Sequence, residues 1–266
     1  MVGARDIDFL QPSIVDMVRV GRNNDGGYVV PVEFLDQTRM LIALGVSDDW
    51  SFEVDFTSRT RQSCSAVLCD RSAGAWTSFI NAVRIWLHPG SMRKATFTRS
   101  WSWLTNGVRF LVQVRLRRWE FYRRWVVATA SNTRREVELR HLLAQHAIPD
   151  ATVVKIDIEG SEYEIVEELC RWNRQATPPI GLIIEFHALH TRLSEARSLI
   201  DELRGWYEVV HLHGNNYGEV RNGIPDVVEV VLTRRTTRTL PKRTTLPLVE
   251  LDQPNNPAVD EIQFQW

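Results

Sequence analysis

The chain has 266 residues, of which 44% are hydrophobic and 24% are charged, values that are typical of a globular protein and exclude a largely disordered one. Its formal net charge of −1 gives no general attraction to nucleic acid. Because no apolar run reaches the roughly 18 residues of a membrane span, and the N-terminus lacks the apolar core of a signal peptide, we expect no span and a cytoplasmic location.

Residues 1–35 form an N-terminal segment that precedes the first predicted core strand. It contains the sequence DGGY at 25–28, in which two glycines permit the positive φ angles of a tight turn. Two interpretations are open: an ordinary turn, or a loop that closes over a bound ligand. In the second, Asp25 and Tyr28 are candidate ligand contacts.

Residues 36–235 alternate between apolar runs and amphipathic stretches. The elements that this pattern predicts are strands at 39–46, 64–70, 93–101, 149–158 and 180–187, helices starting near 48–53 and at 133–148, 162–172 and 193–206, and a final pair of strands at 207–216 and 225–235. Strands that alternate with helices predict an α/β fold with a doubly wound, mainly parallel sheet. The final pair predicts an antiparallel edge strand.

Two segments depart from this alternation. Residues 71–130 form a variable insertion that is rich in aromatic residues and arginine and holds six of the ten tryptophans. Within it, RLRRWEFYRRW at 115–125 is open to two interpretations, a solvated amphipathic helix or a surface for an anionic or sugar partner. Residues 236–266 form a Pro- and Thr-rich C-terminal arm, which we expect to pack over the domain or over a partner subunit in a homodimer.

The predicted parallel strands end in residues that suit a binding site. These residues are Gly45, Asp70, Asp157, and Glu185 with His187 two positions later. In doubly wound sheets ligands bind beyond the carboxyl ends of the strands. We therefore predict that these five residues line one cleft.

The turn after the first of these strands indicates which cofactor the cleft binds. It contains the single glycine Gly45, whereas a dinucleotide pyrophosphate needs several glycines. Asp48 and Asp49 would repel phosphates, and Asp70 can accept hydrogen bonds from both hydroxyls of a ribose. A nucleoside without phosphates fits these features, so we predict S-adenosylmethionine.

Four stretches of the sequence resemble the FkbM-type methyltransferases. KIDIEGSEYEIV at 155–166 looks like the K-x-D-x-E-G-x-E signature of that family, and LIIEFH at 182–187 resembles its strand-end E-x-H. ALGVSDDWSFEVDF at 43–56 and NNDGGYVV at 23–30 are similar to elements of its sugar-modifying relatives. The resemblance covers about residues 20–235. It implies a class I methyltransferase-like fold with a seven-stranded sheet, and O-methylation by S-adenosylmethionine of sugars or other hydroxylated metabolites.

The same motifs, taken with the strand-end argument, imply two sets of contacts. The candidate cofactor-binding residues are Gly45, Asp48, Trp50, Ser51, Phe52, Glu53 and Asp70. The candidate substrate-binding residues are Asp25, Tyr28, Glu159 and Asn215.

Transfer of a methyl group to a sugar hydroxyl needs a base, or a metal ion that acidifies the hydroxyl. Asp157 and Glu185 end neighbouring predicted strands and would repel one another unless a cation or a proton lies between them. His187 is the candidate general base, and His213 is either a third ligand or an alternative base. We therefore predict these four residues as catalytic, with Asp157, Glu185 and His213 as candidate ligands of Mg²⁺.

The helix after Asp157 begins with further charged residues. Glu162 and Glu164 are expected to be solvated in its first turn, where the helix dipole favours acids. Lys155 and Glu159 are open to interpretation as an ion pair across the strand end.

Two other function classes remain open at this point. One is an NAD(P)-dependent oxidoreductase, against which the single-glycine turn argues. The other is a non-catalytic relative that binds a nucleoside or a protein partner through the aromatic, arginine-rich segment. A nucleic-acid methyltransferase is disfavoured, because the net charge is near zero and there is no Asn-Pro-Pro-aromatic motif.

Overall fold

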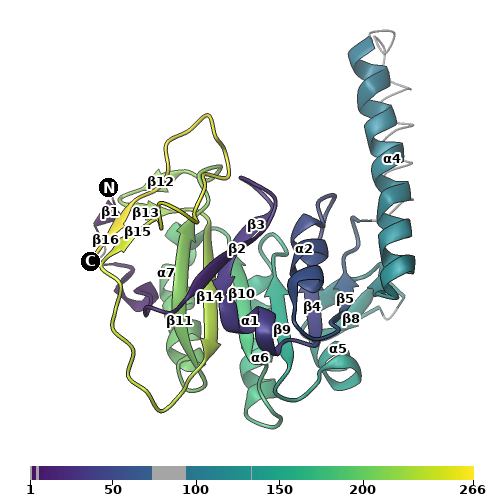
Figure 1. Ribbon diagram of the computed structural model, residues 1–266. Helices are drawn as coiled ribbons and strands as arrows, with labels where there is room; N and C mark the ends of the chain where they lie inside the picture. The colour runs from purple at the N-terminus through teal and green to yellow at the C-terminus, as the bar shows by residue number, and fades with distance from the viewer. Residues whose placement is uncertain (1, 4–5, 74–93, 133) are drawn as a thin grey trace.

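A central seven-stranded sheet organises the computed structural model, which describes residues 2–3, 6–73, 94–132 and 134–266 (Figure 1). Its strand order is β11-β14-β10-β9-β4-β5-β6. The strands are β4 (Met40–Leu44), β5 (Ser65–Cys69), β6 (Glu120–Tyr122), β9 (Thr152–Ile156), β10 (Gly181–Phe186), β11 (Tyr207–Gly214) and β14 (Val228–Arg234). Only β14 runs antiparallel to its neighbours within this sheet. The predicted α/β, mainly parallel, seven-stranded sheet is confirmed.

The position of the antiparallel strand differs from the prediction in one respect. β14 pairs with β10 on one side and with β11 on the other, so it lies one position inside the edge. The chain passes from β11 through the short strands β12 (Val220–Arg221) and β13 (Ile224–Pro225) and then turns back between β11 and β10. The edge strand β11 is therefore parallel to the other five strands, β10, β9, β4, β5 and β6.

Helices and a hairpin cover the two faces of the sheet. Successive strand residues point to opposite faces, so Val154 belongs to one buried cluster and Val153 to the other. One face packs against α5 (Leu139–His146), α6 (Glu162–Asn173) and α7 (Leu189–Leu203). The other packs against α1 (Val32–Gln37), α2 (Ser51–Arg59) and the hairpin of β2 (Met17–Gly21) and β3 (Gly27–Pro31). Burial on both faces explains why the middle of β9 and of β10 is a continuous apolar run, Val153–Val154 and Leu182–Ile184.

The insertion contains the largest errors of the sequence prediction. The predicted strand at 93–101 is wrong, because its described part, residues 94–101, lies in α4 (Lys94–Arg117). The stretch 115–125 is not a helix beyond Arg117, since its residues 120–122 form β6 at the sheet edge. The predicted helix at 133–148 begins only at Leu139, because residues 136–138 form β8 (Glu136–Glu138), which pairs with β7 (Trp125–Val127).

The C-terminal arm packs on its own domain. Its strands β15 (Thr245–Leu246) and β16 (Phe264–Gln265) form a small sheet with β1 (Val2–Gly3). Further along the arm, Asp252 Oδ1 lies 2.9 Å from Nε2 of the buried His211, and Asn255 donates a hydrogen bond of 3.0 Å to Glu229. The arm therefore covers the β11–β14 end of the sheet.

No helix among the residues that the structure describes is both long enough and apolar enough to span a membrane.

Candidate functional site

A cavity of about 680 Å³ opens beyond the carboxyl ends of β4, β5, β9 and β10. The five strand-end residues of the prediction, Gly45, Asp70, Asp157, Glu185 and His187, all line it. Of the other predicted contacts, those that also line the cavity are Asp25, Tyr28, Asp48, Phe52, Glu159 and Asn215. The parallel sheet thus brings together strand-end residues as far apart in the chain as Gly45 and His187, which is expected because the carboxyl ends of parallel strands meet at one edge.

Gly45 forms the turn after β4 because no other residue fits there. Its φ angle is +76°, and a Cβ atom at this position would lie 1.6 Å from the carbonyl oxygen of Asp157. Backbone hydrogen bonds join the turn to both neighbouring strands, from Gly45 N to Cys69 O at 3.0 Å and from Asp157 N to Leu44 O at 2.9 Å. The absence of a side chain therefore lets the first turn approach the acidic residue after β9.

Asp70 holds this turn in place from the end of β5. Its Oδ2 accepts hydrogen bonds from the backbone of Val46 and Ser47 at 2.8 and 2.6 Å, and its Oδ1 accepts three from Ser72 and Ala73. Burial alone raises the pKa of Asp70, but these donors outweigh it and lower the pKa. Five protein donors occupy a group with about four lone-pair positions, so a ribose hydroxyl would have to share them.

The acidic centre of the cavity is built around Tyr28. Its hydroxyl donates to Oδ2 of Asp157 at 2.9 Å and lies 3.5 Å from Oε2 of Glu185. Nζ of the buried Lys155 lies 3.2 Å from the same oxygen of Asp157 and 3.6 Å from the buried Glu53. Burial lowers the pKa of Lys155, but its carboxylate neighbours outweigh this and raise the pKa above its usual range. Lys155 thus pairs with Asp157 and Glu53, not with Glu159.

Glu185 lacks sufficient compensation for a negative charge. Burial raises its pKa well above the usual value, and the charges of Asp157 and Glu229 raise it further. The amide of Asn215 donates a hydrogen bond of 2.9 Å to its Oε1. Asp157 and Glu185 together therefore favour binding of a proton or of a cation.

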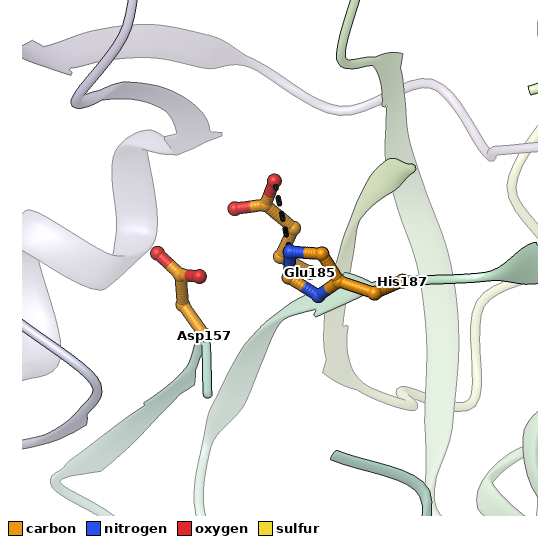
Figure 2. A group of neighbouring side chains, drawn as sticks. All are labelled: Asp157, Glu185 and His187. Atoms are coloured by element: carbon orange, nitrogen blue, oxygen red, sulfur yellow. Dashed lines mark ion pairs between the residues drawn. The ribbon is translucent and has the colours of Figure 1, made fainter. Parts of the chain in front are cut away.

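His187 completes a group with the ligand types of a metal site (Figure 2). Asp157, Glu185 and His187 each offer one ligand atom, and these atoms lie within 4.8 Å of one another. Nε2 of His187 is 3.9 Å from Oε1 of Glu185. Two carboxylates with one imidazole can bind a divalent cation.

His213 lies elsewhere than the predicted site. It is buried, with Nδ1 3.3 Å from Glu229 and Nε2 3.0 Å from Glu261 of the arm, and it does not line the cavity. Because both ring nitrogens face these carboxylates, we do not retain His213 as a base or as a metal ligand. No local sequence pattern indicates that the arm supplies Glu261.

Glu162 is the residue that the sequence analysis most clearly misplaced. It is fully buried, not solvated: its Oε1 accepts a 2.6 Å hydrogen bond from the backbone of His187 and lies 3.3 Å from His187 Nδ1, while its Oε2 accepts one of 2.6 Å from Gly160 N. Burial alone would lower the pKa of His187, but Glu162 outweighs it and raises the pKa. The available signal was its position as the last acid of the K-x-D-x-E-G-x-E motif. Glu164 is exposed, as expected.

Three predicted cofactor contacts support the cavity without lining it. Trp50 packs beside the apolar cluster on the α2 face, the hydroxyl of Ser51 donates to the carbonyl of Gly26 at 3.2 Å, and Glu53 faces Lys155. The first helix turn therefore holds the DGGY turn and the buried lysine in position.

The insertion supplies cavity residues that the sequence analysis did not single out. Arg71, Arg124 and Trp125 line the side beyond β5 and β6, and the Arg71 guanidinium lies 5.4 Å from the centre of the Trp125 ring. Among the side chains of this segment that the structure describes, one tryptophan thus lines the cavity. Trp76 and Trp86 lie outside the described residues.

A comparison of the sequence with protein-family models identifies a family. A family model described as "Methyltransferase FkbM domain" matches residues 2–217. A search of curated proteins found no matching relative. Similar solved structures include a methyltransferase FkbM from Methylobacillus flagellatus KT (14% identity, TM-score 0.40, 74% of this chain and 44% of that one). Another is the precorrin-6y C5,15-methyltransferase from Geobacter metallireducens GS-15 (11% identity, TM-score 0.36, 77% of this chain and 85% of that one). A third is the fibrillarin pre-rRNA processing protein from Methanococcus jannaschii (10% identity, TM-score 0.37, 75% of this chain and 68% of that one).

This chain spans less than half the length of the FkbM structure. The family match covers most of the chain, and it includes all four stretches that carry the resemblance in the sequence. The strand order, with its one antiparallel strand, is that of a class I methyltransferase. The chain belongs to the S-adenosylmethionine-dependent FkbM methyltransferase family.

Proposed function

We propose that the protein is an O-methyltransferase that transfers the methyl group of S-adenosylmethionine to a hydroxyl of a saccharide or a similar hydroxylated metabolite. The observation that carries this proposal is the cavity in which Gly45, Asp70, Asp157, Glu185 and His187 meet. Its volume of about 680 Å³ lies within the ordinary range of small-molecule sites.

The chemistry of the lining fits the cofactor. Asp48, Asp49, Asp70 and Asp157 give this part of the cavity an acidic character, which suits the positive sulfonium and amino groups and repels phosphates. Gly45 leaves the turn beside them free of side-chain atoms. When bound, S-adenosylmethionine supplies an electrophilic methyl group.

Other residues of the lining fit a hydroxylated acceptor. Carboxylates of Asp25 and Glu159 and the amide of Asn215 can hydrogen-bond to sugar hydroxyls, and the ring of the exposed Tyr217 offers a face for the apolar side of a sugar. Acidic groups here also argue against an acceptor that presents a phosphate.

Asp157, Glu185 and His187 are the residues that we assign to activation of the hydroxyl. Without a bound cation, His187, oriented by Glu162, accepts the proton of the acceptor hydroxyl during methyl transfer. Asp157 and Glu185 orient the acceptor, and Lys155 and Tyr28 hold Asp157 in place. A divalent cation such as Mg²⁺, when bound by these three side chains, would lower the pKa of a coordinated hydroxyl.

A screen of hydroxylated acceptors for methyl transfer tests the proposal, with and without a chelator. We expect transfer to a saccharide-type acceptor, and a loss of at least about 100-fold in kcat for Asp157→Asn. Asp201→Asn, an exposed change on α7, is the matched control and should leave kcat unchanged. Loss on chelation and recovery with Mg²⁺ assigns the cation to the mechanism; unchanged activity leaves His187 as the sole base.

Binding titrations, together with the acceptor screen, distinguish the methyltransferase from an oxidoreductase and from a non-catalytic relative. Binding titrations should show S-adenosylmethionine binding and no NAD(P) binding, and the reverse would indicate an oxidoreductase. Cofactor binding without transfer to any acceptor would favour a non-catalytic relative. A normally folded Asp157→Asn variant with full activity would contradict the assignment of Asp157.

A further inference from the structure

Helix α4 projects from the body of the molecule beyond α2 and β5 (Figure 1). Its C-terminal half is anchored on one side by Phe110, whose buried ring lies 5.0 Å from the ring of Trp50 and 4.9 Å from that of Phe121. This side of the helix therefore belongs to the core, and the opposite side faces outward.

The outward side of α4 is apolar. Val108, Leu111, Val112 and Leu116 are 61%, 53%, 46% and 75% exposed. Three of them are spaced by four residues and so form a stripe along the helix, with Leu111 beside it. Single exposed apolar residues are ordinary, but a contiguous stripe of four marks an interaction surface.

Positive charge surrounds this stripe. Arg109 and Arg115 are exposed and lie on either side of it at helical spacing, and α4 contains no acidic residue. Residues 94–124 carry eight basic side chains and one acidic one, although the net charge of the whole chain is −1. The charge of the molecule is thus strongly polarised toward α4.

An apolar stripe with arginines beside it fits some classes of binding partner better than others. Two copies joined symmetrically through the stripe would bring their arginines together, which costs free energy. A nucleic acid would satisfy the arginines but would leave the aliphatic side chains without a role. An anionic lipid surface satisfies both: aliphatic side chains enter the acyl boundary while arginines at the flanks reach the phosphates.

We propose that the exposed face of α4 (Val108, Leu111, Val112 and Leu116, with Arg109 and Arg115) binds an anionic lipid surface. Beyond the C-terminal end of α4 in the chain, Trp125 is 54% exposed and lines the cavity together with Arg124. Tryptophan and arginine are favoured at the interface between water and lipid.

Sedimentation of the full-length protein with lipid vesicles tests this proposal. We expect binding to vesicles of phosphatidylcholine mixed with phosphatidylglycerol, at least about tenfold weaker binding to phosphatidylcholine alone, and weakening by salt. The variants Leu111→Ser/Leu116→Ser and Arg109→Gln/Arg115→Gln should each bind the mixed vesicles at least about tenfold more weakly. Two kinds of variant keep the test informative if one of them folds poorly, which circular dichroism would reveal.

A matched control comes from the arm. Val249 and Val259 are also exposed apolar residues, 92% and 48%, and lie outside α4. The variant Val249→Ser/Val259→Ser should bind vesicles like the wild type. The proposal is overturned if the wild type does not bind the mixed vesicles, if binding ignores lipid charge, or if the control loses as much as the α4 variants. It is also overturned if light scattering shows a dimer that Leu111→Ser/Leu116→Ser dissociates, since the face would then join two copies.

Discussion

Glu162 determines how His187 is presented to the cavity. One carboxylate oxygen contacts both the backbone and the ring of His187, and the other binds the backbone of Gly160. The side chain therefore ties the loop after β9 to the end of β10, and its charge orients the imidazole. A carboxylate behind an active-site histidine commonly fixes the ring orientation and the position of its proton.

Replacement of Glu162 by glutamine should separate orientation from packing. The amide keeps the shape but loses the charge and one acceptor, so we expect kcat to fall at least about tenfold and the free energy of unfolding to fall by about 1–3 kcal/mol. The KM for S-adenosylmethionine should stay near the wild-type value, because Glu162 does not line the cavity. Steady-state kinetics and urea denaturation measure these quantities.

Glu164→Gln is the control for this variant. It lies on the same helix turn but is exposed, near Arg192. It should change neither kcat nor stability appreciably. A Glu162→Gln enzyme with wild-type kcat would show that Glu162 only stabilises the loop.

At the scale of elements, the turn after β4 is the most constrained part of the site. Its glycine has a positive φ angle and lies against the backbone of Asp157, while Asp70 binds the next two amides of the turn. Three strands thus converge on a few backbone atoms. A displacement of this turn would disturb the cofactor side and the acidic centre together.

Two glycine substitutions can separate backbone strain from steric contact at this turn. Gly45 and Gly223 have nearly equal φ angles of +76° and +77°, but a Cβ atom would meet the backbone of Asp157 at the first and nothing within 4 Å at the second. Gly223→Ala should lose about 1–2 kcal/mol of stability, the cost of a left-handed alanine. Gly45→Ala should lose clearly more and fail to bind S-adenosylmethionine in a calorimetric titration. Equal losses would mean that the turn relaxes around the new methyl group.

The sequence predicted the elements of the site better than their surroundings. Gly45, Asp70, Asp157 and Glu185 were identifiable because an apolar strand that ends in a polar residue is a local pattern, and parallel strands share one rim. The burial of Glu162 could not be predicted in this way, since its partner His187 lies 25 residues later in the chain. The strand predicted at 93–101 failed for another reason: alternating threonine and aromatic residues favour a strand locally, and the helix that forms there continues to residues with helical spacing.

At the scale of the whole molecule, a buried group of ionisable side chains joins the C-terminal arm to the sheet. His213 of β11 lies between Glu229 of β14 and Glu261 of the arm, with Asp252 nearby and Arg19 of β2 also in their field. Burial alone lowers the pKa of His213, but the carboxylates outweigh it and raise the pKa from 6.5 to about 10. The folded protein therefore keeps a proton on His213 over a pH range in which the unfolded chain has lost it.

The free energy of unfolding should consequently depend on pH in the alkaline range. The stabilisation by protonated His213 is fully present below pH 6.5 and is lost as the pH rises toward 10, so stability should fall between these values. In His213→Gln this slope should be reduced, although the variant is less stable overall. Denaturant unfolding at several pH values measures it. His141→Gln, an exposed histidine change on α5, should retain the wild-type slope, and an unchanged slope in His213→Gln would refute the assignment.

The insertion of β14 between β10 and β11 has a consequence for synthesis on the ribosome. The seven residues of β14 must insert between β10 and β11, and both of these strands are translated before β14. Until they emerge from the exit tunnel, β10 and β11 present unpaired edges that can pair with other chains. A nascent chain that stops before residue 228 should therefore depend on chaperones, and release of the last strand should end that dependence.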